Sequence, residues 1–130
     1  MSSTQSFESV RSPAVASLFY LGNPLELQQN VRKLLDEASR DVDLPDERIL
    51  RALIVPHAGY VYSGSTAAKA YRLLNNYRDV FRRIILLGPA HRVWIQGIAC
   101  PGVEAFETPL GRIPLALKQI RELLRFQEVQ

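Results

Sequence analysis

The pattern of apolar and polar positions predicts a helix near the start of the chain. Asn23 is suited to an N-cap, Pro24 to the first helical turn, and Glu26 stands at the capping-box position three residues after the cap. Apolar side chains then recur at helical spacing, at Leu27, Val31, Leu34, Leu35 and Ala38. This stripe predicts an amphipathic helix that begins at Asn23 and fades near Arg40.

Two short, continuous apolar runs follow, and each ends in a proline-containing turn. They are "ALIV" at residues 52–55 and "IILL" at residues 84–87, and such runs are typical of buried strands. Between them, residues 57–64 indicate a loop, and residues 65–77 have a helical pattern with Ser63 or Ser65 as cap. Strand, helix and strand form a βαβ unit, which predicts parallel pairing and a right-handed crossover.

The remaining pattern extends this α/β alternation. Residues 93–100 indicate a further strand or two, residues 106–115 a hairpin, and residues 114–126 a closing helix. The polar, Ser-rich residues 1–10 are expected to form a flexible N-terminus, and residues 11–130 one α/β domain. The expected fold is therefore α/β, a mainly parallel sheet with flanking helices.

Composition narrows the class of protein. Apolar residues make up 47% of the chain and charged residues 22%, a balance that indicates a folded globular protein rather than a disordered one. The net charge of +3 is distributed along the chain, and the nearest basic cluster lacks interleaved aromatic residues beyond two tyrosines, so no nucleic-acid partner is expected. That cluster consists of Arg72, Arg78, Arg82 and Arg83, with Tyr71 and Tyr77 nearby.

The cysteine count and the apolar runs bear on location. Cys100 is the single cysteine, which excludes an internal disulfide and suits a reducing compartment. No apolar run approaches the length of a membrane span, and residues 1–10 lack the pattern of a secretory signal. A cytoplasmic location without membrane association is expected.

The two histidines of the chain occupy matching positions. His57 follows the first apolar run and His91 the second, each in a turn rich in glycine and proline. Adjacent parallel strands would bring both imidazoles to the same edge of the sheet, where ligands bind in such folds. Neutral imidazole is a common metal ligand, so a shared metal site is one interpretation; two ordinary loop histidines bonded to the backbone are the other.

Two histidines do not complete a metal site. Structural zinc takes four protein ligands and catalytic zinc three, whereas non-haem iron adds a carboxylate to two histidines. Cys100, Glu104 and Glu107 are weak candidates for a third ligand, because a free cysteine often packs as a small apolar side chain and the glutamates are expected in a loop. The sequence lacks G-x-S-x-G, Walker A and G-x-G-x-x-G motifs.

Three stretches together resemble the Memo family, whose bacterial members are called AmmeMemoRadiSam system protein B. They are "PHAGYVYSGSTAAKAY", "IILLGPAHRV" and "FETPLG", and "RSPAVASLFY" is similar to the family's N-terminal segment. The resemblance runs from about residue 11 to the end of the chain. It implies a fold similar to the N-terminal half of the class III extradiol dioxygenases (LigB-like). It also implies that His57 and His91 bind a divalent transition metal such as iron, copper or zinc.

The chain departs from that family in length. Members of the family are longer, and their third ligand, typically a cysteine, comes from a later segment whose position Cys100 does not occupy. The chain is therefore expected to be truncated, to hold metal weakly, and to leave a sheet edge uncovered that favours association.

Three functions follow from the resemblance. The first is a Memo-like metal-binding protein with a redox or dioxygenase-like role, as a metal-dependent oxidoreductase, with a small molecule or a peptide in the histidine pocket. The second is a non-catalytic module that binds a peptide or phosphopeptide, where Arg92 beside His91 would meet the anion. The third is an inactive fragment.

Overall fold

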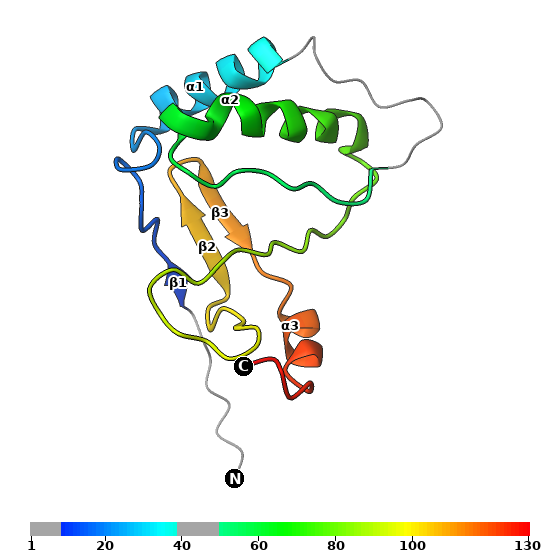
Figure 1. Cartoon of the computed structure of the whole chain (residues 1–130). Coiled ribbons are helices and arrows are strands. Elements are labelled where there is room, and N and C mark those ends of the chain that lie inside the picture. Colours follow the sequence, from blue (N-terminus) through cyan, green and yellow to red (C-terminus); the bar gives the residue numbers. More distant parts are fainter. Residues whose placement is uncertain (1–8, 39–49) are drawn as a thin grey trace. The chain divides into compact units, whose positions relative to one another are not determined.

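The computed structural model describes residues 9–38 and 50–130, which fall into two compact units. We call residues 13–82 the helical unit, and residues 9–12 with 83–130 the sheet unit (Figure 1). Helices and a small mixed sheet make the chain an α/β protein. The expected flexible N-terminus lies mostly outside the described residues, and the expected single domain stays a prediction.

Helix α1 (Pro24–Glu37) begins where the sequence predicts. The Asn23 side-chain oxygen accepts hydrogen bonds from the backbone N–H groups of Leu25, at 3.0 Å, and Glu26, at 3.2 Å. These bonds satisfy two of the N–H groups that a helix start leaves without partners. The apolar stripe faces inward as expected, with its first and last members, Leu27 and Ala38, buried. Arg40, the predicted end, lies outside the described residues.

Helix α2 (Tyr60–Tyr71) starts earlier than predicted, and part of the expected loop at residues 57–64 is helical. Gly59, rather than a serine, is the N-cap residue. The helix continues directly into a 3₁₀ helix, η2 (Arg72–Tyr77). Glycine and serine have low helix propensity, so this start is stabilised by tertiary contacts that local propensity does not report.

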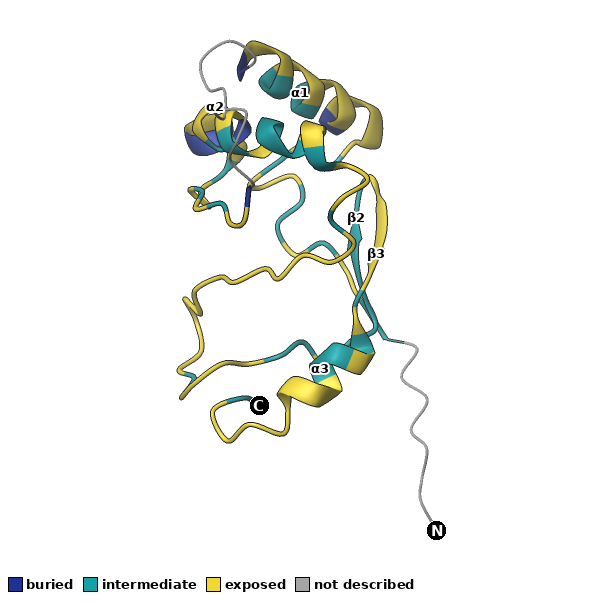
Figure 2. Cartoon of the chain, turned by 90° about the vertical axis from the view of Figure 1, so that its right-hand side faces the viewer, coloured by how far each residue is buried: buried dark blue, intermediate teal, exposed yellow. Residues whose placement is uncertain are grey.

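The contact between α1 and α2 supplies those tertiary interactions. Ser63, Gly64 and Ala68 are buried on α2, and Figure 2 shows buried residues on both helices. A Cβ atom added at Gly64 would lie 3.1 Å from Leu34 Cδ1, which is tighter than ordinary packing. Glycine at this position therefore lets the two helices approach closely.

The sheet unit contains a three-stranded mixed sheet. Strand β1 (Val10–Arg11) pairs in parallel with β2 (Ala105–Thr108), and β2 pairs in antiparallel fashion with β3 (Gly111–Pro114). The predicted hairpin is thereby confirmed. Its turn is held by the Thr108 hydroxyl, which accepts from Leu110 N at 3.1 Å and donates to the Gly111 carbonyl at 3.0 Å.

The end of the chain forms a helix and a short backbone pairing. Helix α3 (Leu117–Leu123) lies within the closing helix that the sequence predicts. Ile98 N donates to the Glu128 carbonyl at 2.7 Å, and Gln130 N donates to the Ile98 carbonyl at 2.9 Å. The strands expected over residues 93–100 are thus represented by one isolated parallel bridge, Ile98 to Val129.

The two apolar runs that were expected to form central strands lie outside the sheet. Residues 52–55 and 84–87 have no regular secondary structure, and Ile54 is fully exposed. A strand requires a neighbouring strand for its hydrogen bonds, and a continuous apolar run requires cover on both faces. Neither requirement is met within the described part of the chain. The expected mainly parallel sheet is therefore not confirmed, and the observed sheet is mixed.

Substitution of Asn23 by alanine is expected to destabilise the helical unit by about 1 kcal/mol, because two N–H groups at the start of α1 lose their acceptor. Urea unfolding monitored by circular dichroism measures the change. Gln29→Ala, at an exposed site on the same helix, is the matched control and should not destabilise. Equal unfolding midpoints for the Asn23→Ala variant and the unchanged chain would contradict the role of the cap.

Candidate metal centre

The turn that carries His57 is anchored on its C-terminal side. The exposed His57 precedes Ala58, whose carbonyl accepts a hydrogen bond from the Ser63 hydroxyl at 3.0 Å. Tyr60 N donates to the Phe19 carbonyl at 2.8 Å. The first turn of α2 and the segment before α1 therefore fix the backbone beside His57.

His91 lies in a different setting. It follows the exposed residues 84–87 and the Gly88–Pro89 turn, in a bend of the sheet unit. Its side chain is exposed, as are those of its neighbours Arg92 and Trp94. The residues around His91 thus offer an exposed imidazole beside a guanidinium group.

The two histidines belong to different units. His57 is part of the helical unit and His91 part of the sheet unit, each described by itself. A site shared by the two imidazoles therefore stays a prediction. Their donor chemistry suits a transition metal, because neutral imidazole binds iron, copper and zinc.

The three candidates for a third ligand all lie in the sheet unit, in separate settings. Cys100 is partly buried, and its N–H donates to the Gln130 carbonyl at 2.6 Å. Glu107 lies on strand β2 rather than in the expected loop, and its Oε1 lies 3.5 Å from Nε of Arg112 on β3. Glu104 N donates to the Ser9 carbonyl at 2.9 Å, which ties its backbone to the segment before β1.

Residues 9–38 and 50–130 contain no group of three or more His, Cys, Asp or Glu that could hold a metal ion.

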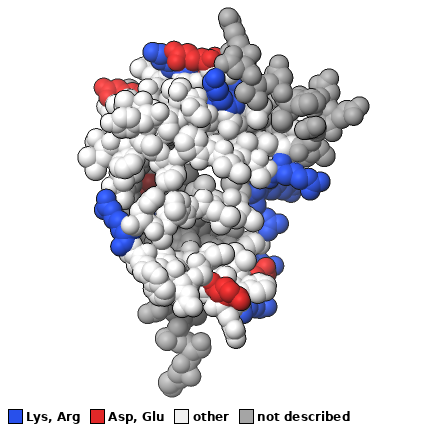
Figure 3. Space-filling view, viewed as in Figure 1, with Lys and Arg blue, Asp and Glu red and all other residues white. Residues whose placement is uncertain are grey.

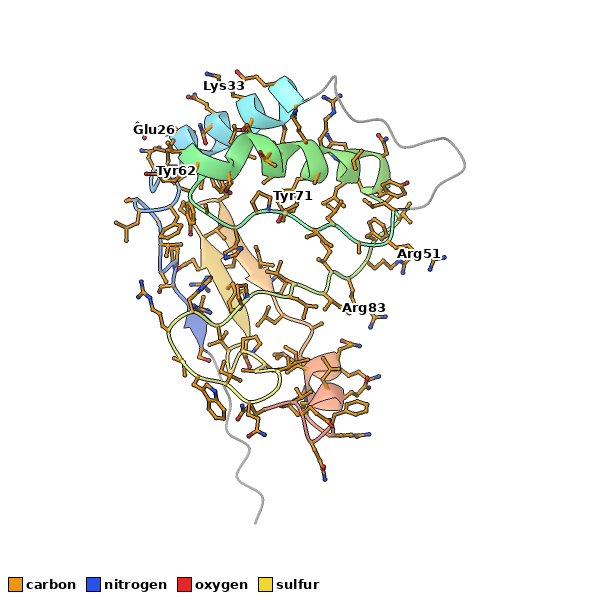
Figure 4. All side chains as sticks on the ribbon, viewed as in Figure 1. Glu26, Lys33, Arg51, Tyr62, Tyr71 and Arg83 are labelled. Atoms are coloured by element: carbon orange, nitrogen blue, oxygen red, sulfur yellow. The ribbon has the colours of Figure 1, made fainter. Side chains whose placement is uncertain are left out.

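The helical unit also has an apolar groove that the sequence analysis did not identify. It has a volume of about 140 Å³ and lies between α1 and α2. Its lining includes Val31, Leu34, Leu35, Tyr60 and Tyr71, and Figure 4 shows the position of Tyr71 on α2. The sequence feature that relates to this groove is the row of small residues on α2. By itself, such a row indicates close packing of helices and does not predict a groove.

Tyr60 has an altered pKa at the edge of this groove. Burial raises the pKa of its hydroxyl above the ordinary value, and the nearby Tyr20 and Tyr71 raise it further. The Tyr20 and Tyr60 rings lie with their centroids 5.7 Å apart and tilted, a favourable aromatic arrangement. Ionisation of Tyr60 is therefore disfavoured in the folded chain.

In Figure 3 the visible face is largely uncharged, and Lys and Arg side chains occur in separate places. The described helices include none that is long and apolar enough to cross a membrane.

Comparison with known proteins identifies the class of this α/β chain. The sequence profile of the family described as "Memo-like protein" matches residues 11–130. The chain therefore belongs to the Memo family, as its histidine motifs indicated.

Individual relatives agree with this assignment. "Protein memo-1 homolog" of Caenorhabditis elegans is 36% identical over 116 residues, which cover 89% of this chain and 31% of the relative. "MEMO1 family protein" of Aquifex aeolicus is 32% identical over 117 residues, 90% of this chain and 40% of the relative. "Protein MEMO1" of Homo sapiens is 42% identical over 77 residues, 59% of this chain and 25% of the relative. The chain thus spans well under half the length of these relatives.

The raised pKa of Tyr60 predicts a loss of stability at alkaline pH. The folded chain keeps its phenol proton at pH values where the unfolded chain, with a pKa near 10.0, releases it. The contribution of protonated Tyr60 to the free energy of unfolding is therefore fully present below pH 10.0. It is lost as pH rises through the pKa of Tyr60 in the folded chain.

Urea unfolding between pH 8 and pH 11.5 checks this sign. The free energy of unfolding should fall more steeply above about pH 10 for the unchanged chain than for Tyr60→Phe. Tyr62→Phe, at a highly exposed position on the same helix, should behave like the unchanged chain. Identical curves for the unchanged chain and Tyr60→Phe would show that Tyr60 ionises without cost.

Proposed function

We propose that this chain is a Memo-type metal-binding protein in which His57 and His91 are ligands of one divalent transition metal ion. The observation that carries the proposal is the position of the two imidazoles. Each is exposed in a turn directly after an apolar run, and both turns fall within the family match over residues 11–130. Two hydrogen bonds also hold the turn beside His57. The backbone that carries this imidazole is therefore fixed before a metal ion binds.

The proposed site needs the LigB-like arrangement in which residues 52–55 and 84–87 are neighbouring parallel strands. In that arrangement both histidines emerge at the carboxyl ends of the strands, where α/β folds bind ligands. Iron or copper bound there would supply redox or oxygen chemistry, and zinc would supply a Lewis acid. Each imidazole would bind the metal ion through a ring nitrogen that carries no proton.

Two imidazoles alone hold a metal weakly, because mononuclear sites in proteins use three or four protein ligands. Water and a substrate donor atom would fill the remaining positions. A small molecule or a peptide with an oxygen or nitrogen donor is the class of ligand that such an open site accepts. Arg92, exposed beside His91, offers a bidentate partner for a carboxylate or phosphate on that ligand.

The test is metal content after equilibrium dialysis against iron, copper or zinc. The unchanged chain should bind one metal ion per chain, and the His57→Ala, His91→Ala double variant should lose it. Each single variant should bind at least about tenfold more weakly than the unchanged chain, because one ligand is lost. Gln29→Ala, at an exposed position of α1 that is not a candidate ligand, is the matched control and should leave metal content unchanged.

Equal metal content in the unchanged chain and the double variant would overturn the shared site. Binding of a phosphotyrosine peptide that survives a chelator would instead favour an interaction module. Metal analysis and peptide titration on the same protein preparation separate these outcomes.

A further inference from the structure

Ser63 contacts the turn after His57 with both of its hydrogen-bond donors. Its hydroxyl donates to the Ala58 carbonyl at 3.0 Å, and its N–H donates to the Gly59 carbonyl at 3.1 Å. These carbonyls belong to two consecutive peptide groups, Ala58–Gly59 and Gly59–Tyr60. Because a peptide group is planar, a bond to its carbonyl restricts the orientation of the whole group. Ser63 therefore restricts two successive peptide planes next to the histidine.

The side chain of Ser63 is placed for this contact rather than for capping the helix. It is buried, with 8% exposure, and it is the fourth residue of α2, whose N-cap is Gly59. A capping serine accepts from N–H groups at the helix start, and a serine within a helix commonly donates to the carbonyl four residues before it. The Ser63 hydroxyl instead reaches five residues back, to the carbonyl of Ala58 outside the helix. Since alanine favours a helix more than serine does, this bond is what the serine adds at its position.

The loop before α1, residues 15–22, holds the other side of the same turn. Figure 1 shows this loop beside the start of α2, where Tyr60 N donates to the Phe19 carbonyl at 2.8 Å. A Cβ atom at Gly59 would lie 3.3 Å from the Phe19 carbonyl oxygen, so the two backbones are in close contact. The Gly59–Tyr60 peptide group is thus held by backbone bonds alone, and the Ser63 hydroxyl adds the bond nearer to the histidine.

We propose that Ser63 is a positioning residue for His57, whose hydroxyl holds the Ala58 carbonyl and so presents the imidazole from one backbone conformation. Ser63 is not a ligand of the proposed metal site, and the inference rests on that site only for its effect on metal affinity. An imidazole on an ordered backbone loses less conformational entropy when it binds a metal ion. Groups that orient a metal ligand typically change metal affinity by about 10–100-fold.

Backbone nitrogen-15 relaxation of the full chain without metal tests the positioning directly. Ser63→Ala should lower the order parameters of residues 57–59 from about 0.85, typical of rigid backbone, toward about 0.6, and those around His91 should not change. Ser65→Ala, the same substitution at an exposed position of the same helix, is the matched control and should change none of them. Order parameters at residues 57–59 that are already low in the unchanged chain, or that Ser63→Ala does not lower, overturn the proposal.

Ser63→Thr separates the hydroxyl from a general effect on the helix. Threonine keeps a hydroxyl that can donate to a carbonyl of the preceding turn, so the order parameters of residues 57–59 should return toward those of the unchanged chain. A role in helix stability alone would lower the urea midpoint of Ser63→Ala and leave these order parameters unchanged. A loss of order in Ser63→Thr as large as in Ser63→Ala would show that the hydroxyl is not the cause, and would overturn the proposal.

Zinc titration measures the consequence for binding. Ser63→Ala should bind zinc about tenfold more weakly than the unchanged chain, and Ser65→Ala should bind it equally well. Equal zinc affinity in Ser63→Ala and the unchanged chain contradicts the positioning role. Failure of the shared metal site has a different signature, because the unchanged chain then binds no zinc while Ser63→Ala still lowers the order parameters of residues 57–59.

Discussion

The position of both histidines depends on how the apolar runs before them satisfy their backbone hydrogen bonds. A strand cannot form alone, because its N–H and C=O groups point sideways to a neighbour. Residues 52–55 lead to His57 and residues 84–87 lead to His91, and neither run is part of the observed sheet. In the proposed metal site, a strand partner for each run would decide which groups the two imidazoles meet.

The features that the sequence predicted well are local ones. The cap at Asn23, the amphipathic stripe of α1 and the turn of the β2–β3 hairpin involve residues within a few positions of one another, so residue types and spacing suffice. The start of α2 was missed because Gly64 and Ser63 are poor helix formers whose place is decided by packing against α1. The groove between α1 and α2 could not be foreseen for the same reason.

The non-local features are those that the sequence did not establish. Apolar runs identify segments with strand-forming potential, but parallel pairing joins residues far apart along the chain. The short pairing of residues 98–100 shows the same dependence, since its partner lies at the end of the chain. The family resemblance supplied what local patterns could not, and the match over residues 11–130 confirms it.

His57 lies in a well-anchored turn and His91 in an exposed bend, in a family member that spans 31% and 40% of the length of two relatives. We propose that one metal ion binds both imidazoles. The chain has two histidines, so nitrogen-15 NMR of histidine-labelled protein can follow each imidazole during titration with zinc. If one ion binds both, the two sets of signals shift together, with the same dependence on metal concentration. Signals that shift at different zinc concentrations, or a shift at one histidine alone, would contradict it.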